Sequence, residues 1–246
     1  YLHNLLEGDG EEKPRPCGAN HMFSVRRWCN RDDEFIWSLM PTTKLTSMTY
    51  ALENEGISPK HGLAVRKGRA FYHPWNYDPF NHPYKIQDPI DGTWYPSNQF
   101  GKGDLTSGNY PDNGEGMNIK GERYFPVREY AIATYINYVV PLMERMSKAY
   151  LMSGDRNIAH KCAVLLAKVA YEYPNNSDKA NRARKKTWGP LSGLVTDEIW
   201  ETFKLTSMAQ AYDAIYDAIH DAFNDAYSIE IINYYYKIIY NYKHAA

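Results

Sequence analysis

The chain has 246 residues, enough for one large domain or two small ones, and its apolar and charged fractions are 43% and 23%. These fractions are typical of a globular protein and exclude the disordered and collagen-like classes. Lys and Arg number 28 against 29 Asp and Glu, so no net positive charge favours a nucleic acid as a partner. No apolar run approaches the roughly 20 residues of a transmembrane helix, so we expect no membrane span.

The aromatic content is unusual, with 22 Tyr and 6 Trp. An aromatic ring that carries a polar group can stack on a sugar and still form hydrogen bonds. Packing in the core and at interfaces explains the same residues, and by number it must explain most of them.

The first 30 residues contain five Gly and Pro and few periodic apolar positions, which predicts an extended arm wrapped around the body. Cys17 and Cys29 are twelve residues apart in this arm. A disulfide between them, as in an exported protein, and two separate thiols both remain open. Arg31 to Glu55 has partial helical spacing interrupted at Pro41, which predicts two short helices that end at Gly56.

The segment from Ser58 to Arg123 contains seven prolines, many glycines and ten large aromatic residues. Proline at this density excludes long regular elements. A solvated linker would not carry so many rings. We therefore expect an ordered, irregular loop layer that lies over a helical body and forms one wall of a cleft.

From Val127 the apolar residues recur at three- and four-residue steps, which predicts a helix kinked or divided at Pro141. Gly154 then suits a left-handed helix end, and Asp155 suits the cap of the next helix. A second apolar stripe, which includes Cys162 as a buried thiol, ends before Pro174. The two helices are thus expected to form an antiparallel hairpin from Val127 to Tyr173.

The rest of the chain is predicted to be a polar loop followed by two helices. The loop covers Asn175 to Gly193, and the helices cover Asp197 to Phe223 and Ile229 to Tyr242. The predicted fold is mainly α. Residues 1–126 form the arm, short helices and loop layer, residues 127–246 form antiparallel helices, and both belong to one continuous domain.

Two stretches carry a family resemblance. Residues 146–155 (MSKAYLMSGD) with residues 159–163 (AHKCA) resemble a helix pair of the heparinase II/III-like polysaccharide lyases, and residues 193–200 and 209–213 look similar to the next helices of that family. The resemblance implies an incomplete α/α toroid, a groove for an acidic polysaccharide, cleavage by β-elimination, and a secreted or periplasmic location.

The active site of that family contains an Asn-His pair, a Tyr and a further His, and a C-terminal β-sandwich follows the helices. The two Asn-His pairs of this chain, at residues 20–21 and 81–82, lie upstream of the expected position. The chain reaches Ala246 without a β-rich segment. We therefore expect the catalytic residues to lie beyond Ala246.

β-Elimination on a uronate requires neutralisation of the carboxylate, a base for the C5 proton and an acid for the leaving oxygen. Tyr, Asn and Arg side chains serve such needs, and Trp stacks on sugar rings. The candidate substrate-binding residues are Trp94, Tyr95, Asn98, Arg123, Tyr124, Arg128, Trp200 and Tyr212. Each aromatic candidate can equally be packed in the core.

Two further classes remain open. A glycoside hydrolase with a similar toroid needs two carboxylates, for which the candidates are Asp197, Glu198, Glu201 and Asp213. A non-catalytic carbohydrate-binding module needs only the aromatic loop layer.

No cofactor is expected. Calcium bound by Asp104, Asp112 and Glu115 is the alternative, although turn formation explains these residues more simply.

Overall fold

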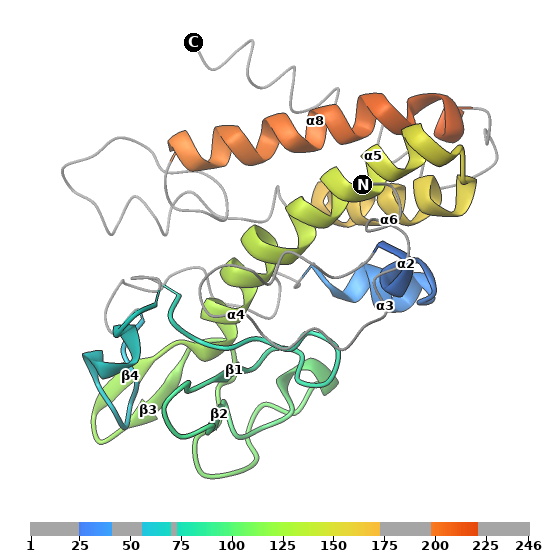
Figure 1. Cartoon of the computed structure of the whole chain (residues 1–246). Coiled ribbons are helices and arrows are strands. Elements are labelled where there is room, and N and C mark those ends of the chain that lie inside the picture. The colour runs from blue at the N-terminus through green and yellow to red at the C-terminus, as the bar shows by residue number, and fades with distance from the viewer. Residues whose placement is uncertain (1–24, 41–55, 70–72, 173–197, 221–246) are drawn as a thin grey trace, which may run out of the picture.

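The computed structural model describes residues 25–40, 56–69, 73–172 and 198–220. This part of the chain is mainly helical and has two regions (Figure 1). The helical bundle contains α2 (Val25–Cys29), α3 (Asp33–Ser38), α5 (Val140–Ser153), α6 (Arg156–Glu172) and α8 (Glu198–His220). The loop lobe contains residues 56–69 and 73–125 together with α4 (Pro126–Thr134). None of the described helices has the length and apolar character that a membrane crossing requires.

The hairpin predicted from Val127 to Tyr173 is confirmed as far as Glu172, the last described residue of α6. Gly154 ends α5 in the left-handed conformation, with φ of 68°, and its N–H donates to the Tyr150 carbonyl at 2.7 Å. Asp155 caps α6 because its carboxylate accepts the Asn157 N–H at 2.9 Å. Glycine is favoured at position 154 because a side chain there would meet the steric penalty of a positive φ.

The kink expected at Pro141 takes the form of a π-helical turn. This turn, η3 (Tyr135–Val139), joins α4 to α5, and the Val140 N–H donates to the Tyr135 carbonyl. Proline lacks the N–H of a regular α-helical ladder, so a widened turn just before it relieves the conflict with the preceding carbonyls. The chain therefore passes from the loop lobe into the bundle through one continuous helical segment (Figure 1).

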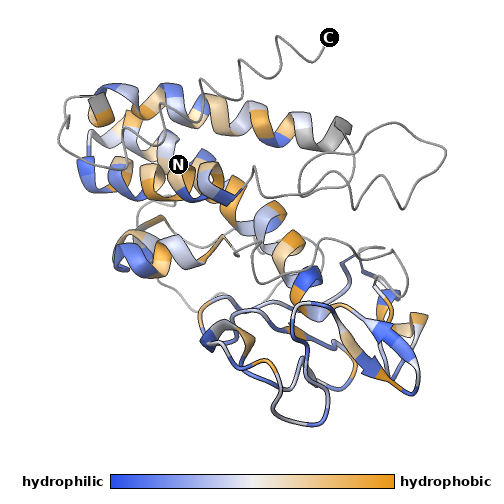
Figure 2. Ribbon diagram, turned by 180° about the vertical axis from the view of Figure 1, so that it is seen from behind, coloured by the Kyte–Doolittle hydropathy of each residue, from blue (hydrophilic) through white to orange (hydrophobic). Residues whose placement is uncertain are grey.

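The bundle core is apolar and is formed mainly by α5, α6 and α8. Its fully buried side chains include Met143, Met146, Leu165 and Ile215, and Cys162 is the predicted buried thiol. In Figure 2 the hydrophobic colour is concentrated on the helices, whereas the ribbon of the loop lobe is mostly polar or intermediate. The helical period of the sequence thus corresponds to faces that pack against one another.

The loop lobe contains two small antiparallel hairpins and two 3-10 turns. β1 (Ile86–Gln87) pairs with β2 (Trp94–Tyr95), and β3 (Met117–Ile119) pairs with β4 (Glu122–Tyr124). The 3-10 turns are η1 (Leu63–Arg66) and η2 (Phe100–Lys102). The expectation of ordered, irregular chain without long elements is confirmed for these residues.

The loop lobe has a core of its own instead of lying over the helices as a layer. Trp75, Ile86, Tyr95, Met117 and Tyr130 are buried together in this second core. Tyr130 belongs to α4, so the lobe surrounds the first helix of the α4–α5 segment at one end of the bundle (Figure 1).

An aromatic cluster joins the two regions. Phe80 of the lobe stacks on Phe35 of α3 at 5.3 Å between ring centroids and lies 4.5 Å from Trp28 of α2. The Arg27 guanidinium lies 4.0 Å above the Phe80 ring. The loop segment around Phe80 is therefore fixed against α2 and α3.

The expectation of an extended arm through residue 30 is wrong for Val25–Cys29, which form α2. Val25, Trp28 and Cys29 are buried in the bundle core, so tertiary packing stabilises a helix too short to be stable alone. Cys29 is a free thiol in the structure. Residues 1–24, with Cys17, lie outside the described residues, as do residues 41–55, the Asn175 to Gly193 loop and the predicted helix from Ile229 to Tyr242.

Candidate functional site in the loop lobe

One face of the loop lobe has a row of polar and aromatic side chains across three adjacent stretches of chain. Asn76 pairs with Gln87 through an antiparallel bridge, and Gln87 pairs with Trp94 in the β1–β2 hairpin. Directly opposite residues point to the same face of a sheet, and neighbouring stretches lie roughly 4.8 Å apart. The side chains of Asn76, Gln87 and Trp94 therefore line up over about 10 Å.

Hydrogen bonds fix this row. The Asn76 Nδ2 donates to Gln87 Oε1 at 3.1 Å, and Gln87 Nε2 donates to the Gly92 carbonyl at 3.1 Å. Arg69 extends the row, because its guanidinium donates to Asn76 Oδ1 at 2.9 Å and to the Pro74 carbonyl at 3.1 Å. Both acceptors are neutral oxygens. Within the described chain, Arg69 has no carboxylate partner, so its positive charge is not compensated there.

The aromatic end of the row is a stacked pair. The His82 ring lies 4.0 Å from the Trp94 ring at an interplanar angle of 19°, and both side chains are half-buried. Asp78 holds the turn that places His82, because its carboxylate accepts the backbone N–H groups of Phe80 and Asn81 at 3.0 and 3.1 Å. We call Arg69, Asn76, Gln87, Trp94 and His82 the outer row.

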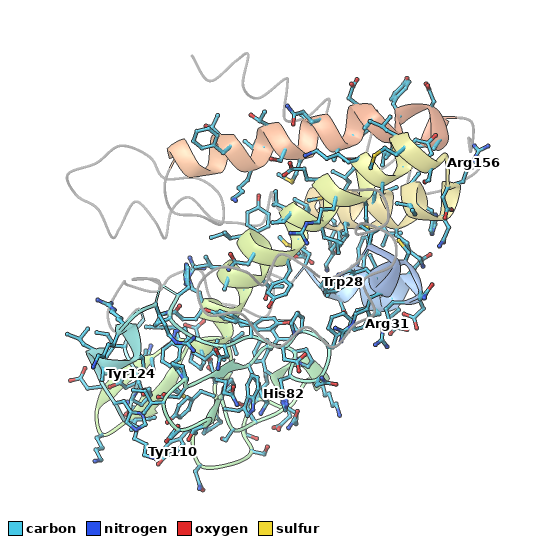
Figure 3. The ribbon with its side chains drawn as sticks, in the orientation of Figure 1. Trp28, Arg31, His82, Tyr110, Tyr124 and Arg156 are labelled. Atoms are coloured by element: carbon cyan, nitrogen blue, oxygen red, sulfur yellow. The ribbon has the colours of Figure 1, made fainter. Side chains whose placement is uncertain are left out.

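The opposite face of the same hairpin borders a pocket. Ile86 and Tyr95 line it from the hairpin, Trp75 and Met117 line it from the lobe core, and Tyr124 and Glu129 are also among its lining residues. The space inside it is narrow and has room for about one water molecule. We call this space the inner pocket. Figure 3 labels Tyr124 and Tyr110 on one side of the lobe and His82 on the side nearer α2 and α3.

Two histidine–carboxylate pairs lie beside the inner pocket. The Glu129 carboxylate accepts the Gly56 N–H at 2.7 Å and lies 3.0 Å from His73 Nδ1. Asp88, which is fully buried, lies 3.0 Å from His61 Nδ1. A carboxylate at Nδ1 orients an imidazole ring and fixes its tautomer.

Asp88 is held as a carboxylate. Burial by itself raises its pKa, but the Ser58 hydroxyl, His61 and the Ile90 N–H all donate to it, and together they hold the pKa below its ordinary value. Asp88 thus joins the Ser58–His61 turn to the β1–β2 hairpin.

Both tyrosines of the inner pocket remain protonated at neutral pH. Burial, with the nearby Asp88 carboxylate as a second cause, raises the pKa of Tyr95 to about 12. Burial also raises the pKa of Tyr124. The phenols of the pocket are therefore neutral hydrogen-bonding groups.

His61, Asp88 and Asp91 are the one metal-ligand-like cluster among the described residues. Lys60 Nζ lies 2.5 Å from Asp91 Oδ2, and Asp88 already accepts three hydrogen bonds. A bound ion would have to displace the ammonium group of Lys60. The residues present therefore form a charge-compensated network.

Asp104, Asp112 and Glu115, the alternative calcium ligands, are not arranged around a common point: the two aspartates accept backbone hydrogen bonds, and the glutamate is exposed. Asp104 accepts the N–H groups of Gln99, Thr106 and Ser107. Asp112 is buried and accepts the N–H groups of Gly114, Gly116 and Val127. Glu115 is exposed. The two aspartates therefore stabilise turns and the first turn of α4, as the simpler interpretation had it.

The candidate binding residues separate into different environments. Tyr95 and Tyr124 are brought together at the inner pocket, whereas Trp94 lies on the opposite face of the hairpin. Arg123 is exposed on β4, and Arg128 is buried in α4. The eight candidates thus do not form one site.

Asn98 is a structural residue. It is fully buried, and its amide accepts the Asp112 N–H at 3.0 Å while donating to the carbonyls of Asp104 at 2.6 Å and Asp112 at 2.9 Å. No part of its side chain is available to a substrate. The expectation of a binding role for Asn98 is therefore wrong.

The candidates on α8 belong to the bundle. Tyr212 is half-buried against the main core, and Asp213 is exposed. The side chains of Trp200, Glu198 and Glu201, and Asp197 as a whole, lie outside the described residues. His160 Nε2 of α6 lies 2.7 Å from the Asp33 carboxylate of α3.

Sequence reasoning missed most of the outer row. Arg69, Asn76 and Gln87 lie in proline-rich chain without periodicity, so no pattern predicted that they would become neighbours. The aromatic content of the segment was the one available signal, and it led only to Trp94.

The chain was compared with protein-family models, curated proteins and solved structures, and it matches none of them.

Proposed function

We propose that this chain is a polysaccharide lyase-type protein that binds a uronic-acid-containing polymer, with β-elimination as the reaction class. The observation that carries the proposal is the outer row, where a stacked Trp–His pair shares one face of the loop lobe with Arg69, an arginine that has no carboxylate partner among the described residues. The likeness of the hairpin residues to heparinase II/III-like lyases supports the reaction class.

The chemistry of the outer row suits an acidic sugar chain. The Trp94 ring offers a planar apolar surface to a pyranose ring, and the amides of Asn76 and Gln87 are suited to hydroxyl groups. The Arg69 guanidinium has the fork geometry that matches a carboxylate. Its partners among the described residues are neutral oxygens, so a uronate carboxylate would add a charge-assisted interaction to them.

The proposed scaffold is an incomplete α/α toroid. Support comes from the antiparallel packing of α5 against α6 and from the contacts of α8 with both. A toroid repeats such hairpins around an axis, and α5–α6 would be one of them.

Binding affinity tests the proposal. Titration calorimetry with oligomers of galacturonate, glucuronate and mannuronate should give binding that weakens with salt, and neutral oligosaccharides of equal length should bind more weakly. Arg69→Gln should weaken uronate binding roughly tenfold, because a charge-assisted hydrogen bond is lost. Trp94→Ala should weaken both ligand classes by a similar factor.

Lys67→Gln is the matched control, because Lys67 is exposed and lies two residues from Arg69. It removes the same charge outside the outer row and should leave affinity within about twofold, as is usual for an exposed residue away from the contacts. Equal losses in the two charge variants would contradict the proposed site.

Product analysis separates the enzyme classes. Absorbance of an unsaturated uronide identifies elimination, and new reducing ends without that absorbance identify the hydrolase alternative. Binding without turnover by the protein or by any longer form of it would favour the non-catalytic module.

A further inference from the structure

Two arginines, one in α2 and one in the bend that follows it, lie against the aromatic cluster between the two regions. The Arg27 guanidinium lies 4.0 Å from the centre of the Phe80 ring. The Arg31 guanidinium lies 5.2 Å from the same ring and 5.1 Å from the Phe35 ring. Both arginines are exposed, so one aromatic stack gathers two positive charges on a small patch of the surface. We call Arg27 and Arg31 the arginine pair.

Within the part of the chain that the structure describes, Arg31 forms no ion pair and no side-chain hydrogen bond. The carboxylates that follow it in sequence are placed elsewhere. Asp32 caps the N-terminus of α3, and Asp33 contacts two basic side chains of α6. Glu34 is exposed and is not paired with Arg31. The positive charge of Arg31 is therefore open to an anion from outside the described chain.

The aromatic rings prepare Arg31 for such an anion. A guanidinium that packs on an aromatic ring keeps its N–H donors in its own plane, where they remain available at its edge. The ring contact also removes part of the rotamer freedom that an exposed arginine loses when it binds a ligand. An anion bound here therefore costs less ordering than one bound by an unsupported surface arginine.

The arginine pair adjoins the aromatic end of the outer row. Residues 78–82 form one turn, in which the His82 N–H donates to the Asp78 carbonyl at 2.8 Å. This turn carries Phe80 to the arginine pair and His82 to its stack with Trp94. The Cα atoms of Phe80 and His82 are at most about 7.6 Å apart, because only two peptide units separate them. Figure 3 shows His82 on the side of the lobe nearer Arg31.

We infer that the arginine pair is a second subsite for a uronate carboxylate, which extends the outer row from the loop lobe onto the bundle. The inference rests on the proposed function, because a polymer bound at the outer row is what brings a second carboxylate to α2. Arg69 lies beside Asn76 at one end of the row, and the arginine pair lies beyond His82 at the other. An acidic polymer along the row therefore meets a positive charge at each end. Two linked contacts raise the affinity above that of either, because the first sets a high effective concentration for the second.

The length of the oligomer tests the second subsite. A galacturonate dimer reaches one end of the row, whereas an octamer reaches both, so the affinity of the wild type should rise with length in titration calorimetry. Arg31→Gln should leave the affinity for the dimer within about twofold. It should weaken binding of the octamer roughly tenfold, the loss expected for one charge-assisted contact. Arg69→Gln should weaken binding at every length.

Arg156→Gln is the matched control, because Arg156 is exposed at the end of the bundle away from the loop lobe (Figure 3). It removes the same charge and should leave the affinity for every oligomer within about twofold. Nuclear magnetic resonance of the wild-type chain supplies a measurement that needs no variant. The octamer should shift the Nε–Hε signal of Arg31, and the dimer, added to half-saturation of the outer row, should leave it in place.

Three results would overturn the inference. An unchanged affinity for the octamer in Arg31→Gln, or an Arg31 signal that the octamer does not move, would show that the polymer does not reach the arginine pair. Equal losses in Arg31→Gln and Arg156→Gln would show an effect of net charge alone. Failure of the proposed function has a different signature, because uronate binding would then be indifferent to Arg69→Gln and Trp94→Ala at every length.

Discussion

The helical bundle and the loop lobe differ in how their backbone N–H and C=O groups are hydrogen-bonded. In the bundle the backbone groups pair within the helices, and apolar faces supply the core. The lobe has little regular structure, and fully buried polar side chains take over the pairing of its backbone, among them Asp88, Asn98 and Asp112. The comparison shows that irregular chain becomes ordered when side chains supply the hydrogen bonds that helices provide for themselves.

Lys85 illustrates this use of polar groups. Its ammonium group is buried and donates to the carbonyls of Pro96 at 2.8 Å and Ser97 at 3.2 Å. Burial lowers its pKa, with the Asp104 carboxylate acting in the opposite direction. Two carbonyls without ladder partners are thereby satisfied by one side chain.

The largest decrease in the free energy of unfolding is expected from a substitution in the apolar core of the bundle. Leu165 is fully buried in α6, and Leu165→Ala should lower the free energy of unfolding by about 2 to 5 kcal/mol because it leaves a cavity. Urea unfolding followed by the helical circular dichroism signal measures the change. Leu151→Ala is the control, since Leu151 is 65% exposed, and it should remain within about 0.5 kcal/mol of the wild type.

A smaller decrease in the free energy of unfolding is expected when a buried polar side chain of the lobe is removed. Asn98→Ala removes three hydrogen bonds and leaves buried backbone groups unsatisfied, so it should cost about 1 to 3 kcal/mol. Urea unfolding followed by tryptophan fluorescence reports on the change, because Trp75 and Trp94 lie in the lobe. Gln99→Ala, at the exposed neighbour, should cost little. Near-wild-type stability of Asn98→Ala would contradict the idea that buried polar groups stabilise the lobe.

The smallest expected effect is on how the free energy of unfolding changes between pH 5 and pH 3. The folded state holds the pKa of Asp88 below its ordinary value of about 3.9, so the unfolded state binds the proton more readily. The contribution of Asp88 is therefore fully present above that value and is lost as the pH falls through the folded pKa. Asp88→Asn should reduce the fall in unfolding free energy between pH 5 and pH 3.

Urea unfolding at the two pH values measures this difference. Asp213→Asn on α8 is the control, because Asp213 is exposed, and it should leave the fall unchanged. An unchanged fall in Asp88→Asn would show that Asp88 is not held as a carboxylate by its partners. The pKa values of Asp33 and Asp91 are lowered by their own partners, so part of the fall should persist in Asp88→Asn.

The same contrast explains what could be predicted from sequence. The α5–α6 hairpin was predictable to within a few residues, because helical periodicity, Gly154 and Asp155 are all local signals. The helix at Val25–Cys29 was missed, since its stability comes from burial of Trp28 against residues distant in sequence. Asn98 was mistaken for a binding residue because nothing local reveals that its amide is enclosed by Asp104 and Asp112.

The candidate site was the least predictable part. Trp94 stood out as an aromatic in a turn-rich segment, but its neighbours Arg69 and Gln87 are brought to it by pairing that no periodic pattern encodes.

Hydrogen exchange with and without an oligouronate tests the division into a scaffold and a binding region most directly. The account predicts ligand-dependent protection at residues 69 and 73–94 of the lobe, and unchanged exchange in α5, α6 and α8. Protection centred on those helices, with the lobe unaffected, would contradict it.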